Sequence, residues 1–200
     1  MDSNILISLS PKLIFTFQDA SGGIWKLDIS VSLTKKAPEL LQSYHAGPIN
    51  GLAPCPYTHM LATIGKDGTV RVFDYLQKTN MCIRKFKAGG SSILWPGRSL
   101  DNQMSTLIAG FTDGVVRVFQ LEKADQESQY EMKMTLQTAA KPHNGAITAI
   151  CVDDDGRTLI TGSKDKTIFF FDISSAYMPV GFIKLDAAVT CMAWSSHAVS

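Results

Sequence analysis

Two stretches of this chain, His45–Asp74 and His143–Asp172, share one layout. Each opens with a histidine and ends with a Phe-Asp pair, and short apolar runs and two turn signals lie between. In each stretch a threonine follows the histidine by 18 positions, and an aspartate in a turn follows it by 22. Two polar sets with the same internal spacing indicate a repeat, and a repeat constrains the choice of fold more than any other sequence feature.

The turn that precedes the third strand of each expected unit recurs along the whole chain. Intervals of 46, 46 and 52 residues separate the turn positions Ser21, Asp67, Asp113 and Asp165. The same three intervals separate the expected ends of the third strands, Asp28, Asp74, Gln120 and Asp172. The additional six residues fit a charged loop at 122–131. A period of roughly 40 to 50 residues with four short strands per repeat predicts an all-β propeller, and no helical period competes.

The expected strands group into four blades and the start of a fifth. Alternating apolar residues, as at 5–9, and turns such as Asp67-Gly68 are typical of antiparallel hairpins. The third unit is degenerate because Gly89-Gly90 stands where the others carry His-x-Gly, and the run Ala188–Trp194 matches an innermost strand. The predicted blades comprise residues 5–44, 45–87, 88–138 and 139–185, and a further blade begins at 186–200.

Composition and charge argue against several classes of partner. The net charge of +1 creates no global attraction to nucleic acid or anionic lipid, and the small basic cluster Arg84, Lys85 and Lys87 alternates like the outward face of a strand. No apolar run approaches the roughly 20 residues of a membrane helix, and the start lacks the basic segment of a secretion signal. We therefore expect a cytoplasmic protein with no nucleic-acid, membrane or small-molecule partner.

Cofactor and metal chemistry is also not expected. The cysteines stand singly in apolar runs, without the spacing of a zinc site, at Cys55, Cys82, Cys151 and Cys191. Asp153–Gly156 reads as a solvated turn because it lacks the alternating ligands and distal glutamate of a calcium loop. Gly89-Gly90 lacks the Lys-Ser/Thr pair of a phosphate-binding loop. The sequence predicts buried free thiols, no metal and no cofactor.

His-x-Gly, a small-residue strand, an Asp-centred turn and a closing aromatic-Asp pair resemble the WD-repeat signature over residues 5–194. In that family the His, Ser/Thr, Asp and Trp of a repeat form a hydrogen-bonded structural network. The resemblance implies two such networks here, whose members are His45, Thr63 and Asp67, and His143, Thr161 and Asp165. The fourth member is expected to be missing, because residues without an indole N–H replace the tryptophan at Leu27, Phe73, Phe119 and Phe171.

The His-Thr-Asp sets have the composition of a catalytic triad, so a catalytic role is one possible interpretation. A serine-type triad needs an exposed nucleophilic oxygen beside its base and an oxyanion hole. Here the hydroxyl is expected mid-strand, and the set occurs twice, as a folding device does. We therefore predict no catalytic residue and no enzyme.

The segments "IAGFTDGVVRVFQL" and "KDKTIFFFDIS" look like those of the WD-repeat cilia- and flagella-associated proteins. That likeness implies a non-catalytic scaffold in the axoneme, which tethers inner-arm dynein to doublet microtubules and has dynein, tether subunits or tubulin as partners. It also implies that these blades are part of a larger propeller, since WD propellers most often have seven. The alternatives are a generic adaptor, such as a ubiquitin-ligase substrate receptor or trafficking subunit, and a propeller enzyme. Contact loops are expected at 45–48, 88–92, 141–146 and 186–188.

Overall fold

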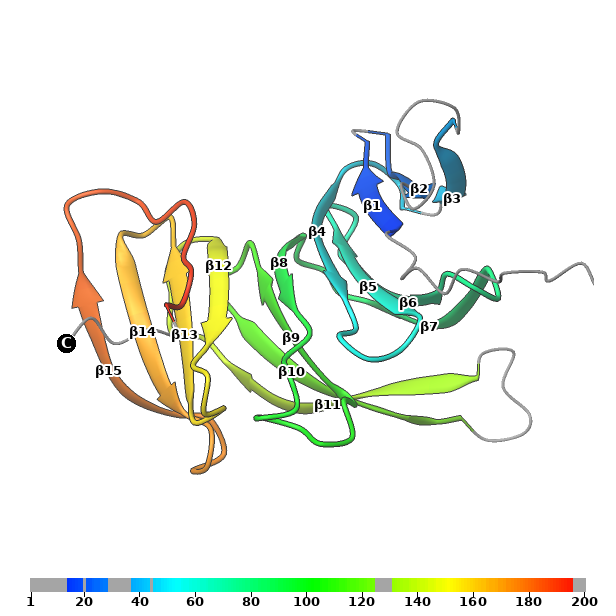
Figure 1. Cartoon of the computed structure of the whole chain (residues 1–200). Coiled ribbons are helices and arrows are strands. Elements are labelled where there is room, and N and C mark those ends of the chain that lie inside the picture. Colours follow the sequence, from blue (N-terminus) through cyan, green and yellow to red (C-terminus); the bar gives the residue numbers. More distant parts are fainter. Residues whose placement is uncertain (1–13, 20, 29–36, 44, 125–130, 196–200) are drawn as a thin grey trace, which may run out of the picture.

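In the computed structural model, fifteen strands of the described residues form four antiparallel sheets that follow one another along the chain (Figure 1). The structure describes residues 14–19, 21–28, 37–43, 45–124 and 131–195. Each sheet is a meander in which sequential strands pair, as in a propeller blade. The predicted all-β propeller class is confirmed, and the strand expected at 5–9 lies outside the described residues.

The four sheets, which we call blades 1 to 4, have the following strands. Blade 1 contains β1 (Ile14–Gln18), β2 (Gly23–Asp28) and β3 (Glu39–Ser43). Blade 2 contains β4 (Ile49–Pro54), β5 (Met60–Gly65), β6 (Thr69–Asp74) and β7 (Thr79–Lys85). Blade 3 contains β8 (Gly90–Leu94), β9 (Thr106–Phe111), β10 (Val116–Lys123) and β11 (Met132–Ala140). Blade 4 contains β12 (Ile147–Val152), β13 (Thr158–Ser163), β14 (Thr167–Asp172) and β15 (Met178–Lys184).

The hairpins between the second and third strands of blades 2 to 4 turn through a residue with positive φ. Gly68 and Gly114 adopt φ of 77° and 78°, as the Asp-Gly signals predict. Lys166 occupies the same position in blade 4 with φ of 69°. The turn geometry therefore repeats even where the glycine does not.

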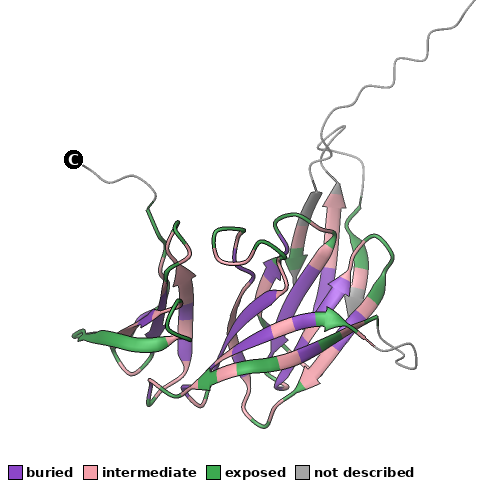
Figure 2. Cartoon of the chain, turned by 90° about the horizontal axis from the view of Figure 1, so that it is seen from below, coloured by how far each residue is buried: buried purple, intermediate pink, exposed green. Residues whose placement is uncertain are grey.

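The hydrophobic core lies between neighbouring blades. One cluster joins blade 2 to blade 3 and includes Ile64, Val72 and Phe119, and a second joins blade 3 to blade 4 and includes Val118 and Phe171. Figure 2 shows the buried positions along the strands and the exposed ones mainly in turns and outer strands. Each blade is therefore stabilised largely by its neighbours, as in other repeat proteins.

Side chains on the innermost strands connect successive blades by one repeated hydrogen bond. Asn50 donates to the carbonyl of Gly90 at 2.7 Å, Ser91 donates to that of Ile147 at 2.6 Å, and Thr148 donates to that of Val189 at 2.7 Å. Val189 thus takes the place that Gly90 and Ile147 hold at the start of β8 and β12.

The strand predicted at 188–194 is nevertheless wrong for the described structure. Its residues carry no strand pairing with any described segment. A strand forms only when it is hydrogen-bonded to a neighbouring strand. In blades 2 to 4 the first strand pairs with the second strand of the same blade. The run keeps its position beside blade 4 and lacks the pairing that would make it a strand.

Three further sequence expectations need correction. The charged loop expected at 122–131 is shorter, because β10 continues to Lys123, and β11 runs to Ala140, past the predicted blade boundary at 138. Arg84 does not face outward: its guanidinium lies over the rings of Phe86 and Phe119 and donates to the carbonyl of Met134 at 2.8 Å. The hydrogen bond and the cation–π contacts draw this arginine into the junction between blades 2 and 3.

Candidate functional site

The histidine set of blade 2 is a connected hydrogen-bond network. Nε2 of His45 lies 2.9 Å from Oγ1 of Thr63, and Nδ1 lies 3.1 Å from Oδ1 of Asp67. The loop histidine is thereby joined to β5 and to the turn between β5 and β6. His45 and Thr63 are both buried. The structure brings together all three residues predicted for this set.

Thr69 is a fourth member that the sequence did not reveal. Its hydroxyl lies 2.9 Å from Nδ1 of His45 and donates to Oδ1 of Asp67 at 2.8 Å. Because that hydroxyl proton points to the carboxylate, Nδ1–H of His45 has to be the donor toward Thr69 and Asp67. Nε2 then accepts from Thr63, so a neutral imidazole satisfies every partner.

Blade 4 repeats the arrangement atom for atom. Nε2 of His143 lies 2.8 Å from Oγ1 of Thr161, and Nδ1 lies 2.8 Å from Oγ1 of Thr167 and 3.4 Å from Oδ1 of Asp165. Thr167 donates to Oδ1 of Asp165 at 2.5 Å, and the backbone N–H of Asn144 donates to Oδ2 at 2.7 Å. His143 and Thr161 are fully buried.

The threonine that completes each set could have been found from spacing. It follows the turn aspartate by two positions in both sets, as Asp67-Gly68-Thr69 and Asp165-Lys166-Thr167, whereas the degenerate blade 3 has Val115 there. The resemblance to the family implied a tryptophan at the end of the third strand as the fourth member instead. Phe73 and Phe171 occupy that place, and both are fully buried as apolar core.

Blades 1 and 3 use their turn aspartates differently. In blade 3, Asp113 accepts from Arg117 at 3.1 Å, and no histidine is present. In blade 1 the carboxylate comes from Asp19 and not from the aligned Ser21: it accepts from Nε1 of Trp25 at 2.8 Å and from two backbone N–H groups of the turn. The turn itself keeps the predicted position, because Gly22 follows Ser21 with a φ of 90°, and only the carboxylate is displaced by two residues.

The two networks hold their histidines neutral and their aspartates ionised. Burial lowers the pKa of His45 and of His143, and it outweighs the opposing effect of Asp67 and Asp165. Burial by itself raises the pKa of Asp67, but hydrogen bonds from Thr69, His45 and Ala46 together outweigh it and hold that pKa below its usual range. The pKa of Asp165 is lowered in the same way. A neutral ring that donates to a carboxylate suits a fixed structural brace.

Acidification is expected to destabilise the fold in two stages. The folded-state pKa of His45 and of His143 lies below the unfolded value, so their contribution is complete above about pH 6.5 and is lost as pH falls toward the folded pKa. The aspartates follow at lower pH, below about 3.8, because their pKa is also lowered. Urea unfolding between pH 7.5 and 5 measures the first stage. A His45→Gln/His143→Gln variant should have a flatter profile, and an equally steep one would contradict this account.

Asp165→Ala is expected to lower the free energy of unfolding by about 2 to 3 kcal/mol, because it leaves the buried ring of His143 and the half-buried hydroxyl of Thr167 without their acceptor. Asp154→Ala is the matched control: that residue is exposed in another turn of the same blade, and its loss should change stability by less than about 0.5 kcal/mol. Chemical unfolding of both variants provides the comparison. Equal stability of the two would show that Asp165 does not brace the blade.

The geometry gives these sets no route to nucleophilic chemistry. The side chains of Thr63 and Thr161 lie mid-strand, with 2% and 0% of their surface exposed, so no substrate atom can reach their hydroxyls. Each hydroxyl donates to a histidine that is itself held from the other side. What the arrangement can do is fix a loop to a turn within one blade.

The cysteines and the possible metal ligands give no further reactive site in the described part of the chain. In the described part of the chain, no three His, Cys, Asp or Glu side chains are grouped so that they could hold a metal ion. Cys55 and Cys82 are buried free thiols, and burial raises the pKa of Cys82 to about 12. Cys191 is exposed, contrary to expectation, because it lies in the unpaired run after blade 4. Among the described residues, there is no helix long and apolar enough to cross a membrane.

Comparisons with known proteins match this architecture. The family described as "WD domain, G-beta repeat" matches residues 38–74 and 134–172, which include both histidine sets. Cilia- and flagella-associated protein 44 of Mus musculus is 41% identical over 185 residues, or 89% of this chain and 10% of the relative. The protein of that name in Chlamydomonas reinhardtii is 28% identical over 180 residues, or 77% of this chain and 10% of the relative.

Solved structures agree on the fold. The Chaetomium thermophilum Sqt1 structure, bound to the N-terminus of the ribosomal protein L10, superposes with a TM-score of 0.72 at 16% identity, and covers 89% of this chain and 48% of that one. At this identity the likeness shows the fold alone. The chain spans about a tenth of the length of the curated relatives above. On its repeats, its blades and these likenesses, the chain belongs to the WD-repeat family of β-propeller proteins.

Proposed function

We propose that this chain is part of a non-catalytic protein-interaction scaffold of cilia and flagella. One observation carries the proposal: 41% identity over 185 residues to a mouse protein named for association with cilia and flagella. A similar match to the Chlamydomonas protein of the same name supports it. Within this proposal the protein is an axonemal component that tethers inner-arm dynein to doublet microtubules, and its partners are dynein, tether subunits or tubulin.

The site geometry is consistent with a scaffold. The most organised polar groups are used within blades, as braces between a loop and a turn. Rigid blades that present loops at both edges are a frame for partner contacts. The loops at 45–48 and 141–146 contain His45 and His143, so bracing them also fixes the shape of a surface that a partner can recognise.

A generic adaptor is the second candidate, and a specific observation favours it. The Sqt1 structure has the same fold and is bound to the N-terminus of another protein. A propeller of this fold can therefore bind the N-terminus of another protein. An adaptor for a ubiquitin ligase or a trafficking coat would use the fold in the same way.

Recovery from ciliated cells distinguishes the two candidates. The full-length protein that contains this chain would be tagged and followed through detergent extraction of isolated cilia, and its partners identified by mass spectrometry. The scaffold proposal predicts retention with the demembranated axoneme and co-purification of inner-arm dynein subunits. Exclusive recovery with ligase or coat subunits, together with complete release by detergent, would replace it with the adaptor.

A further inference from the structure

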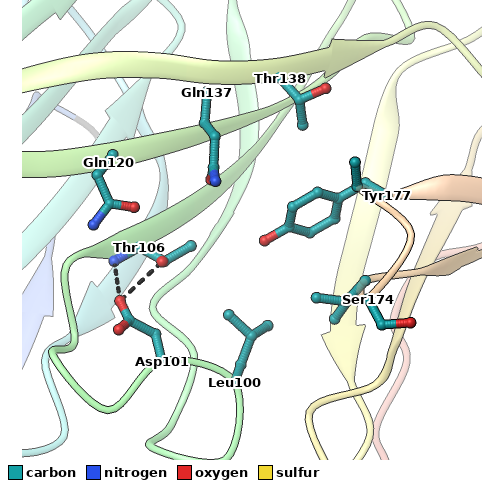
Figure 3. Close-up of a pocket in the computed structure, with 10 residues that line it drawn as sticks. Leu100, Asp101, Thr106, Gln120, Gln137, Thr138, Ser174 and Tyr177 are labelled. Carbon is teal, nitrogen blue, oxygen red and sulfur yellow. Dashed lines mark hydrogen bonds between the residues drawn. The ribbon is translucent and has the colours of Figure 1, made fainter.

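A polar pocket lies at the junction between blades 3 and 4, away from both histidine sets (Figure 3). Its volume is about 470 Å³. Blade 3 contributes Asp101, Gln120 and Gln137 to the lining, and the turn between β14 and β15 contributes Ser174 and Tyr177. No lysine or arginine of the described residues lines it. The pocket is therefore rich in oxygen acceptors and contains a carboxylate.

The turn that places Tyr177 in this pocket is strained. Ala176 and Tyr177 both have positive φ, at 55° and 61°, and neither is a glycine. Two consecutive left-handed residues of this kind cost about 1 to 2 kcal/mol each. Strain of this type persists where the surrounding structure imposes it, and it is concentrated at sites of recognition. In Figure 3 the phenol ring of Tyr177 extends from this turn into the pocket.

Three acceptor oxygens around the pocket keep unused hydrogen-bonding capacity. Oδ2 of Asp101 accepts from Ser105 and Thr106, whereas Oδ1 accepts only from the backbone of Gln103, at 2.8 Å, and so retains a lone pair. Gln120 donates through Nε2 to Ser105, and no hydrogen bond to its Oε1 is found among the described residues. The Tyr177 hydroxyl has no hydrogen-bond partner among the described residues.

The charge state of the pocket is fixed and negative. Burial offsets part of the effect, but hydrogen bonds from Thr106, Gln103 and Ser105 hold the pKa of Asp101 below its usual range, so it is ionised at neutral pH. Burial, and after it the charge of Asp101, raises the pKa of Tyr177, so its hydroxyl stays protonated. A bound group that brings positive charge and several N–H donors would complement this lining.

We propose that this pocket receives an arginine side chain of a partner polypeptide. The Asp101 carboxylate balances the guanidinium charge, and Oε1 of Gln120 and the hydroxyl oxygen of Tyr177 accept N–H groups. The planar guanidinium offers five donors, which matches acceptors on several sides better than the point charge of lysine does. The volume exceeds that of one side chain, so the flanking backbone of the partner also has room.

That the partner is a polypeptide rests on the proposed scaffold function. The binding test below does not depend on that function. The chain would be titrated with acetyl-Gly-Gly-Arg-Gly-Gly-amide while amide resonances are followed by NMR, including the side-chain amides of Gln120 and Gln137. Matched peptides carry citrulline or glutamate in place of arginine. We expect saturable shifts at these amides with the arginine peptide. The citrulline peptide, which keeps the shape and removes the charge, should bind at least about tenfold more weakly.

Two variants make the test specific. Tyr177→Phe keeps the ring and removes one acceptor, so it should weaken the arginine peptide by about three- to tenfold. Tyr57→Phe, at an exposed tyrosine of blade 2, should leave the affinity unchanged. Equal binding of the arginine and citrulline peptides, an unchanged affinity of Tyr177→Phe, or no saturation by the arginine peptide would overturn the proposal. Equally tight binding of guanidinium ion alone would replace the polypeptide by a small cation. None of these outcomes bears on recovery with axonemes.

Discussion

Gly114→Ala is expected to lower the free energy of unfolding by about 2 to 5 kcal/mol. The residue has φ of 78°, which costs a non-glycine residue about 1 to 2 kcal/mol. An added Cβ would also lie 2.1 Å from the carbonyl oxygen of His143. Backbone cannot yield as a flexible side chain does, so the overlap adds about 1 to 3 kcal/mol. Urea unfolding of the variant measures the sum.

The size of this effect would show that blade 3 directly supports the network of blade 4. The turn at Gly114 presses on the loop that carries His143, whose N–H also points to the carbonyl of Gly114 at 3.4 Å. Gly97→Ala is the matched control, because its added Cβ meets no atom within 4 Å. A loss in Gly114→Ala no larger than in the control would contradict the packing described here.

Phe119→Ala should lower the free energy of unfolding by about 3 to 5 kcal/mol, since it removes a large, fully buried side chain from the main core cluster. The ring lies 5.6 Å from that of Phe86, and the guanidinium of Arg84 lies over it at 5.8 Å. The cavity would therefore open at the junction of blades 2 and 3. Calorimetry or chemical unfolding measures the loss.

Phe182→Ala provides the comparison for the core prediction. Phe182 is 61% exposed on β15 and stacks on Phe169 at 5.2 Å, so its removal should lower stability by only about 1 kcal/mol. Similar losses in the two variants would mean that the junction between blades 2 and 3 is not the main core. The core description depends on this difference.

The repeat made most of the fold predictable. The recurring turn positions, 46, 46 and 52 residues apart, located the hairpins, since Asp-Gly pairs demand the positive φ that Gly68 and Gly114 adopt. The shared spacing of 18 and 22 residues after each histidine located His45, Thr63 and Asp67, which the structure places within hydrogen-bonding distance. A repeat is predictable because each unit solves the same packing problem in the same way.

The rest depended on contacts that no spacing rule encodes. Thr69 and Thr167 are the exception, because each follows its turn aspartate by two positions, and each hydroxyl lies within hydrogen-bonding distance of the histidine ring. Arg84 alternates with apolar residues as a solvent-facing residue would, but two aromatic rings and a carbonyl of the next blade draw it inward. The pocket at Tyr177 depends on two strained residues in a turn, and their sequence gives no sign of positive φ.

The central claim is that the two histidine sets brace blades and perform no chemistry. A double-mutant cycle of His143→Ala and Asp165→Ala, measured by urea unfolding at pH 7.5, tests it most directly. If the pair acts as one brace, the two losses in stability are not additive, and the coupling free energy is about 1 to 3 kcal/mol. Losses that add to within about 0.5 kcal/mol would contradict the brace, because residues that do not support each other contribute independently.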